Sequence, residues 1–158
     1  MIQIYTDGAS RGNPGPGGYG VVMIAGALRK EISEGFRLTT NNRMELLSVI
    51  VALEALKKEG TPVTIYSDSK YVVDSVEKKW VFGWEKKYFN GKKNEDLWKR
   101  FLRAYRKHQV KFVWVKGHAS NKENNRCDEL AVAAALGSGL KTDHGYEEEK
   151  RKEDAKLI

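Results

Sequence analysis

Two short runs with the same pattern constrain the fold of this chain more than any other feature. Residues 2–7 and 63–68 are rich in β-branched and aromatic residues, and each ends on an aspartate, which predicts two strands. Between them, apolar residues recur at helical spacing: Leu46, Val49, Ile50, Leu53 and Leu56. A strand–helix–strand crossover makes the two strands parallel, and the carboxyl ends of such strands form the ligand-binding edge of α/β sheets. We therefore expect Asp7 and Asp68 to lie side by side at that edge.

The remaining pattern completes a mixed sheet. After a Gly/Pro-dense turn, residues 19–25 and 28–38 predict two strands that form an antiparallel meander with the first. The crossover helix begins at the capping residues Thr40 to Asn42 and reaches residue 58. The other expected elements are helices at 69–76, 94–108 and 125–136 and a strand at 110–115. The predicted fold is α/β: a five-stranded sheet, three strands antiparallel and the rest parallel through helical crossovers, flanked by helices.

Length and composition bound the class of protein. A chain of 158 residues suits one domain, expected over residues 1–137, and the polar, mixed-charge residues 138–158 are expected to form a mobile tail. No apolar run approaches the roughly 20 residues of a membrane span, so we expect a cytoplasmic protein with no membrane contact. Nothing in the sequence indicates an obligate oligomer, and we expect a monomer. With one cysteine, Cys127, and three histidines, any metal must be held mainly by oxygen.

Positive charge is concentrated in one segment. The chain carries 28 basic and 21 acidic residues, a net charge of +7. Residues 78–107 hold eleven basic and three acidic residues, a local excess of eight, so the remainder is close to neutral. Five aromatic residues are interleaved with these lysines: Trp80, Phe82, Trp84, Tyr88 and Phe89. Such a localised cationic surface favours a polyanionic partner.

Four carboxylates fall where they can converge. Asp7 and Asp68 end their strands, Glu45 is expected in the first turn of the crossover helix, and Asp128 at the start of the last helix. Taken singly, each has a simpler explanation, because Asp is a common turn residue and acidic residues complement a helix N-terminus. Taken together, they would repel unless a cation lay between them. Oxygen ligands suit Mg²⁺ or Mn²⁺, and a pair of ions about 4 Å apart is usual for phosphoryl chemistry.

Five sequence blocks in order resemble ribonuclease H of type 1, and together they span most of the chain. The blocks are Tyr5-Thr6-Asp7-Gly8-Ala9 with Gly12-Asn13-Pro14-Gly15-Pro16-Gly17-Gly18, Thr39-Thr40-Asn41-Asn42-Arg43-Met44-Glu45-Leu46, Tyr66-Ser67-Asp68-Ser69, Trp114-Val115-Lys116-Gly117-His118, and Cys127-Asp128-Glu129-Leu130. The resemblance implies a metal-dependent endonuclease that hydrolyses the RNA strand of RNA–DNA hybrids, without sequence preference, leaving 5′-phosphate and 3′-hydroxyl ends.

The resemblance also assigns catalytic roles. It implies that Asp7, Glu45, Asp68 and Asp128 hold two Mg²⁺ ions, with Mn²⁺ as an alternative metal. His118 follows the last expected strand on a loop, and it would carry a proton during attack or product release.

Substrate contacts follow from the same resemblance. Asn13 and Asn42 would contact the RNA 2′-hydroxyls, and Thr40 and Asn94 a phosphate of the DNA strand. An arginine frequent two residues before that threonine is replaced here by Leu38, with Arg37 displaced by one. The basic protrusion at 78–93 would meet the DNA strand through four residues: Trp80, Trp84, Lys86 and Lys87.

Two other functions stay open at this point. One is a hybrid-binding module that has lost catalysis, although every expected acidic position is filled. The other is a different nuclease of the same fold, such as a resolvase or an integrase. The Asn42 to Glu45 block and the basic protrusion favour hybrid cleavage over this second alternative.

Overall fold

The computed structural model describes residues 1–116 and 121–158. Five strands form one sheet in the order β3-β2-β1-β4-β5. β1 pairs antiparallel with β2, and β2 pairs antiparallel with β3. β1 pairs parallel with β4, and β4 pairs parallel with β5, which confirms the predicted fold class. The strand bounds are β1 Ile2–Ser10, β2 Gly15–Ala25, β3 Leu28–Thr39, β4 Pro62–Ser67 and β5 Gln109–Trp114.

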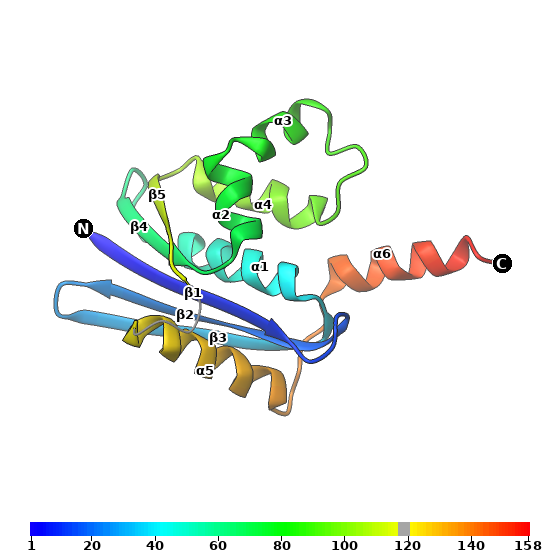
Figure 1. The fold of residues 1–158 in the computed structure, drawn as a ribbon, viewed down its shortest axis with the longest axis horizontal. Helices are drawn as coiled ribbons and strands as arrows, with labels where there is room; N and C mark the ends of the chain where they lie inside the picture. Colours follow the sequence, from blue (N-terminus) through cyan, green and yellow to red (C-terminus); the bar gives the residue numbers. More distant parts are fainter. Residues whose placement is uncertain (117–120) are drawn as a thin grey trace.

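Helices cover both faces of the sheet. Figure 1 shows α1 to α4 on one side of the sheet and α5 on the other, with α6 extending away from the body of the molecule. Their bounds are α1 Asn41–Glu54, α2 Lys70–Glu77, α3 Trp80–Lys86, α4 Glu95–Tyr105, α5 Lys122–Leu136 and α6 His144–Ala155. None of the helices in the described parts of the chain is long and apolar enough to cross a membrane.

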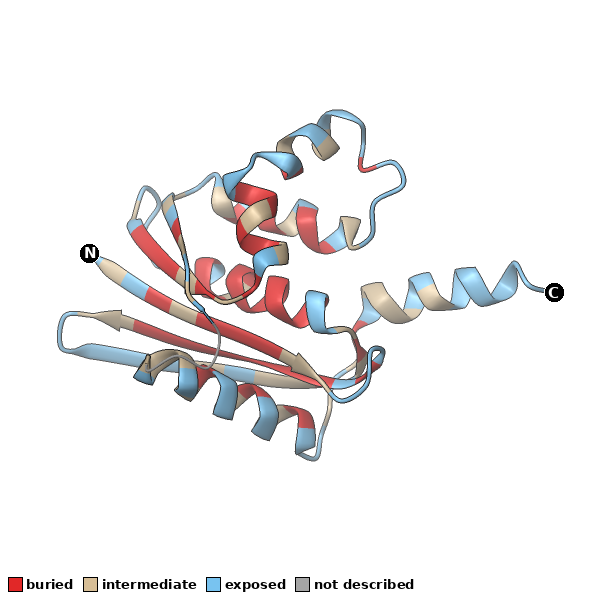
Figure 2. Ribbon diagram, viewed as in Figure 1, coloured by how far each residue is buried: buried red, intermediate tan, exposed pale blue. Residues whose placement is uncertain are grey.

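The main core lies between the sheet and α1. Ile4 of β1, Ile65 of β4 and Ile50 of α1 are fully buried in it. The core continues outward to α4, whose Trp98 and Phe101 are also fully buried, and buried positions are dense on α1, α2 and the inner strands in Figure 2. This burial of apolar surface fixes α1 over β1, and the site that α1 helps to build rests on it.

On the opposite face, α5 lies unusually close to β2. A Cβ atom added at Gly18 or Gly20 would collide with the backbone of α5, at Ala131 and Cys127 respectively. Because these positions lack side chains, the helix can settle directly on the strand through small residues. The predicted turn at 11–18 is too long: β1 continues to Ser10, and β2 already begins at Gly15 rather than at residue 19.

Several predicted boundaries are also wrong. Asp7 does not end its strand, because β1 stays paired with β2 as far as Ser10. α1 ends at Glu54 rather than residue 58, since the chain turns there to enter β4. Glu45 and Asp128 lie in the second turns of α1 and α5, because those helices begin at Asn41 and Lys122. The basic segment also contains a helix, α3, that the sequence analysis does not predict.

The segment after Gly137 contains α6, which is also absent from the sequence analysis. Its start is attached to β3: Lys141 exchanges two backbone hydrogen bonds with Gly35 and Arg37, each of 2.9 Å. No residue of α6 itself is buried. The predicted mobility of residues 138–158 remains a prediction.

Candidate metal centre

The register of the parallel pair β1 and β4 brings two aspartates together. Tyr5 of β1 is paired with Tyr66 of β4, and their rings stack with centroids 4.7 Å apart. That pair is the last in the ladder, and Asp7 and Asp68 each lie two residues beyond it. The strands therefore deliver both carboxylates to the same end of the sheet, as the crossover predicts.

Glu45 joins them from α1 because the helix approaches β1 closely. A Cβ atom added at Gly8 would collide with the backbone of Met44 and Glu45, so only glycine permits this approach. One carboxylate oxygen from each of Asp7, Glu45 and Asp68 lies within 4.8 Å of the others. Glu45 is only 7% exposed and Asp7 only 9%.

Crowding of these acids changes their proton affinity. Burial, together with the charge of Asp68, raises the pKa of Asp7 to about 7 from an ordinary value of 3.8. Burial and the charge of Asp7 also raise the pKa of Glu45 well above its usual range. A backbone N–H from Gly8 donates to Asp7 Oδ1 over 2.9 Å and offsets part of this effect. Without a bound cation, the carboxylates destabilise each other when ionised.

The side chains present fit a hard divalent cation. Glu45 Oε1 is buried and has no hydrogen-bond partner among the residues that the structure describes. Leaving a buried acceptor unsatisfied is costly, and a metal ion would satisfy this oxygen. The cluster offers oxygen atoms alone, which are the ligands that Mg²⁺ and Mn²⁺ prefer.

A cavity of about 530 Å³ opens over the cluster and adds further residues. Asp128 lines it from α5 and is exposed, and Asn42 lines it from the start of α1. Two lysines that the sequence analysis missed, Lys70 and Lys116, also line the cavity. A signal for Lys70 was present, since it follows Asp68 by two positions at the start of a helix. Its Nζ lies 4.5 Å from the centre of the Trp114 ring.

The predicted substrate residues near α1 are held by hydrogen bonds. Asn13 Oδ1 accepts from the backbone N–H of Asn41 over 3.0 Å, which ties the β1–β2 loop to α1. Thr40 is the N-cap of α1, and its hydroxyl accepts from the backbone N–H of Arg43. Asn94 Oδ1 accepts from Arg43 Nη1 over 3.3 Å, so Thr40 and Asn94 share one neighbour. Arg43 itself is a residue to which the sequence analysis assigned no function.

The protrusion separates its two tryptophans. Trp80 is 47% exposed, with Lys78 Nζ 5.3 Å from its ring centre. Trp84 is half-buried, with its ring edge against Trp98 at a centroid distance of 5.8 Å. Lys86, Lys87, Lys92 and Lys93 are all exposed. The surface at the start of α3 is therefore better placed than Trp84 for a flat contact with a ligand.

Two other predicted positions have different outcomes. His118 lies outside the described residues. Arg37 pairs with Glu147 of α6 through two hydrogen bonds of 2.8 Å, so α6 holds the arginine that the sequence places next to the family's usual position.

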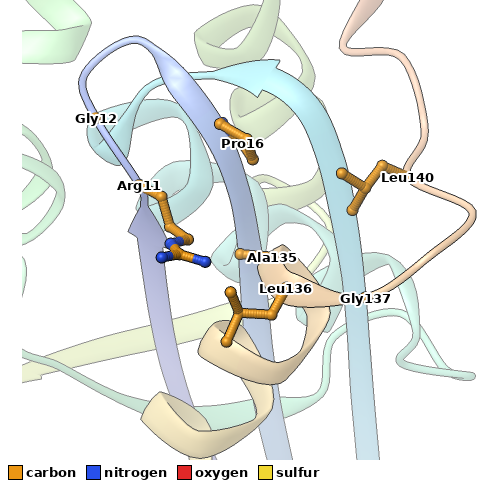
Figure 3. A pocket seen from close by; sticks show the side chains of 7 residues that line it. All are labelled: Arg11, Gly12, Pro16, Ala135, Leu136, Gly137 and Leu140. Carbon is orange, nitrogen blue, oxygen red and sulfur yellow. The ribbon is translucent and has the colours of Figure 1, made fainter.

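A second cavity lies on the opposite face. It has a volume of about 700 Å³ between the β1–β2 loop and the end of α5, where Arg11 lies above Leu136 (Figure 3). Its lining is largely apolar and includes Pro16 and Leu140. It contains none of the four carboxylates, so the polar cavity above the acids is the candidate site.

Comparison with known proteins identifies relatives of this chain. The sequence model of the RNase H family matches residues 1–136. Ribonuclease H of Syntrophus aciditrophicus is 54% identical over 151 residues, covering 92% of this chain and 87% of the relative. Ribonuclease H of Desulforamulus reducens is 56% identical over 147 residues, covering 90% and 92%.

Solved structures agree as well. LC9-RNase H1 superimposes with a TM-score of 0.77 at 36% identity, covering 93% of this chain and 79% of that protein. LC11-RNase H1, solved in complex with an RNA/DNA hybrid, gives a TM-score of 0.65 at 28% identity, covering 85% and 96%. Both the family match and the curated relatives extend over most of the sequence, and the chain therefore belongs to the ribonuclease H family.

Proposed function

We propose that this protein is an endonuclease that hydrolyses the RNA strand of RNA–DNA hybrids in the presence of Mg²⁺, leaving 5′-phosphate and 3′-hydroxyl ends. The observation that carries the proposal is the cluster of Asp7, Glu45 and Asp68, with its unsatisfied buried oxygen, in a chain of the ribonuclease H family. The complex of LC11-RNase H1 with an RNA/DNA hybrid supports the substrate class.

The four acidic residues would hold two Mg²⁺ ions, which when bound activate water and stabilise the leaving oxygen. Asp7 would act as a metal ligand together with Asp68 on the neighbouring strand and Glu45 on α1, since one carboxylate oxygen of each lies within 4.8 Å of the others. Asp128 completes the set from the opposite layer of the molecule. From the sequence, His118 would transfer a proton near the scissile bond.

Substrate recognition is divided between two regions. Asn13 and Asn42 lie around the start of α1 and would contact the RNA 2′-hydroxyls in the shallow minor groove of the hybrid. Thr40 and Asn94 would bind a DNA phosphate. Trp80 and the lysines of the protrusion would bind the DNA strand further along.

We also propose that the enzyme acts as a monomer.

One assay tests the function directly. The purified protein is incubated with Mg²⁺ and labelled RNA–DNA hybrid, double-stranded RNA and double-stranded DNA. We expect cleavage of the RNA in the hybrid only, and a loss of at least about 100-fold for Asp7→Asn. Cleavage of double-stranded DNA would indicate a resolvase-like or integrase-like nuclease. Tight hybrid binding without cleavage would indicate a module that has lost catalysis.

A further inference from the structure

Arg43 is the centre of a buried network that joins four elements. Its side chain is 4% exposed, and all five of its N–H donors are used. It bonds to Asp143 through Nε and Nη2, both at 2.8 Å, and to Asp96 through Nη1 at 2.8 Å and Nη2 at 2.7 Å. The fifth bond goes from Nη1 to Asn94. Because each donor has one acceptor, the position of the guanidinium group is fixed by its partners.

Asp143 is the partner that comes from beyond the region matched by the family model. It is 8% exposed, and the hydroxyl of Thr39 donates to its Oδ2 over 2.7 Å. Its Oδ1 also accepts the backbone N–H of Tyr146, so it is the N-cap of α6. Figure 1 shows α6 starting beside the first turn of α1. A Cβ atom at Gly145 would collide with the Asp96 carboxylate, so α6 packs against the network.

Arg43 in turn contacts both proposed ligands of the DNA phosphate. Its backbone N–H donates to the Thr40 hydroxyl over 3.3 Å, and its guanidinium group donates to Asn94 Oδ1. Asn94 precedes α4 in a left-handed conformation with φ of 65°, and its side chain makes no capping hydrogen bond to that helix. Tyr71 supplies the other contact, as its hydroxyl accepts from Asn94 Nδ2 over 3.0 Å. A shift of the guanidinium group would act on Asn94 directly, whereas Thr40 is linked to Asp143 through its neighbour Thr39.

We propose that Asp143 is a positioning residue for the substrate: through Arg43 it holds Asn94, and through Thr39 it holds the neighbouring Thr40, in the geometry that binds a phosphate of the DNA strand. The C-terminal segment is thus part of the substrate-binding apparatus although it touches no substrate. This inference rests on the proposed function. A purely structural role would weaken binding along the whole hybrid, whereas this role predicts that contact with a single phosphate of the DNA strand is weakened.

Three variants separate these roles. Asp143→Asn weakens the hold on Arg43, and Thr39→Val removes a single hydrogen bond to Asp143 while keeping side-chain shape. Glu148→Gln is the matched control, because it removes an exposed pair with Arg151 within α6 and leaves the Arg43 network and Arg37 unchanged. Circular dichroism first establishes that each variant is folded at the assay temperature.

Steady-state cleavage of hybrid is then measured with Mg²⁺, together with hybrid binding by anisotropy in EDTA. We expect KM and Kd to rise about 5- to 10-fold for Asp143→Asn and less for Thr39→Val, with kcat within about 2-fold. Glu148→Gln should stay within about 2-fold of wild type. Unchanged KM and Kd in both folded network variants, or a fall in kcat alone, would overturn the proposal.

A neutral-phosphate scan supplies the second readout. Single methylphosphonates are placed along the DNA strand, and Kd is measured for each hybrid. For the wild type, the Kd should rise when the methylphosphonate is at one particular position. For Asp143→Asn, the same methylphosphonate should raise the Kd much less, because the contact with that phosphate is already weakened. An equal penalty in both proteins would show a structural role only. Failure of the wild type to cut any hybrid would instead contradict the proposed function, and the binding measurements would still test Asp143.

Discussion

At the scale of single residues, burial and the neighbouring negative charges both raise the pKa values of the acidic cluster. Asp7 and Glu45 are placed by β1 and α1 in an environment that disfavours their charged forms, and the raised pKa values follow from that. The folded protein thus holds protons that the unfolded chain releases. Its stability without metal should fall as pH rises from about 4, the ordinary pKa of Asp7, to its folded pKa of about 7, and stay low above that.

Asp7→Asn should therefore stabilise the metal-free protein. We expect a gain of about 2 kcal/mol at pH 8, with little gain at pH 4, where the wild-type carboxyl is protonated when folded. Mg²⁺ should raise the melting temperature of the wild type at pH 8 and that of the variant much less. Thermal unfolding with EDTA or Mg²⁺ at both pH values measures this. A lower melting temperature for Asp7→Asn in EDTA at pH 8 would contradict it.

At the scale of elements, the protrusion combines a packing helix with a binding surface. α3 turns Trp84 toward Trp98 of α4, while Trp80 at its first position stays exposed. The sequence predicts both as substrate contacts because aromatic residues interleaved with lysines give the same pattern whether they pack in the core or bind a ligand. Only the direction of the unpredicted helix separates them.

The two tryptophans should respond differently to truncation. Trp84→Ala should destabilise the fold by about 2 kcal/mol because it removes a half-buried ring from the Trp98 contact. Trp80→Ala should cost less than about 0.5 kcal/mol of stability and raise KM for the hybrid about 5-fold. Urea unfolding and steady-state kinetics on both variants check this. The reverse pattern would place the ligand on Trp84.

The lysines of the protrusion should determine how strongly the KM for the hybrid depends on salt concentration. Changing Lys86, Lys87, Lys92 and Lys93 to Gln removes four exposed positive charges. We expect KM to rise and its logarithmic dependence on salt to flatten by up to about 3, with the saturated rate almost unchanged. Kinetics between low and moderate salt measure the slope. A lower saturated rate at constant KM would disagree with a role in binding.

At the scale of the whole molecule, sequence patterns predicted the sheet and its crossover helix better than they predicted α6 and the contacts it makes. Period-two and helical patterns gave the strands, α1 and the order of elements, because the core enforces them. The paired register of β1 and β4 then followed, and with it the meeting of Asp7 and Asp68. Sequence could not give α6, which buries no residue of its own, nor the role of Arg43, whose side chain bonds to three residues that lie 51 to 100 positions away.

Hydrogen exchange should show how the C-terminal segment is held. The amide of Lys141 donates to Gly35, and that of Glu147 lies in the turn capped by Asp143, so both should be protected. Amides of the last two turns, with exposed side chains, should exchange at least about 100-fold faster. Uniform slow exchange through Ala155 would contradict the expected mobility of the end of the chain, and fast exchange at Lys141 would mean that the segment is not attached.

The glycine contacts beneath α5 have a mechanical consequence. Three carboxylates are fixed by the sheet and α1, whereas Asp128 sits on a helix whose height above the sheet is set by the missing side chain of Gly20. The methyl group of an alanine at Gly20 would push α5 away from the sheet. Asp128 would move with the helix, and the other three carboxylates would stay in place. The distance from Asp128 to the other three carboxylates would therefore change, whereas the spacing among those three would stay the same.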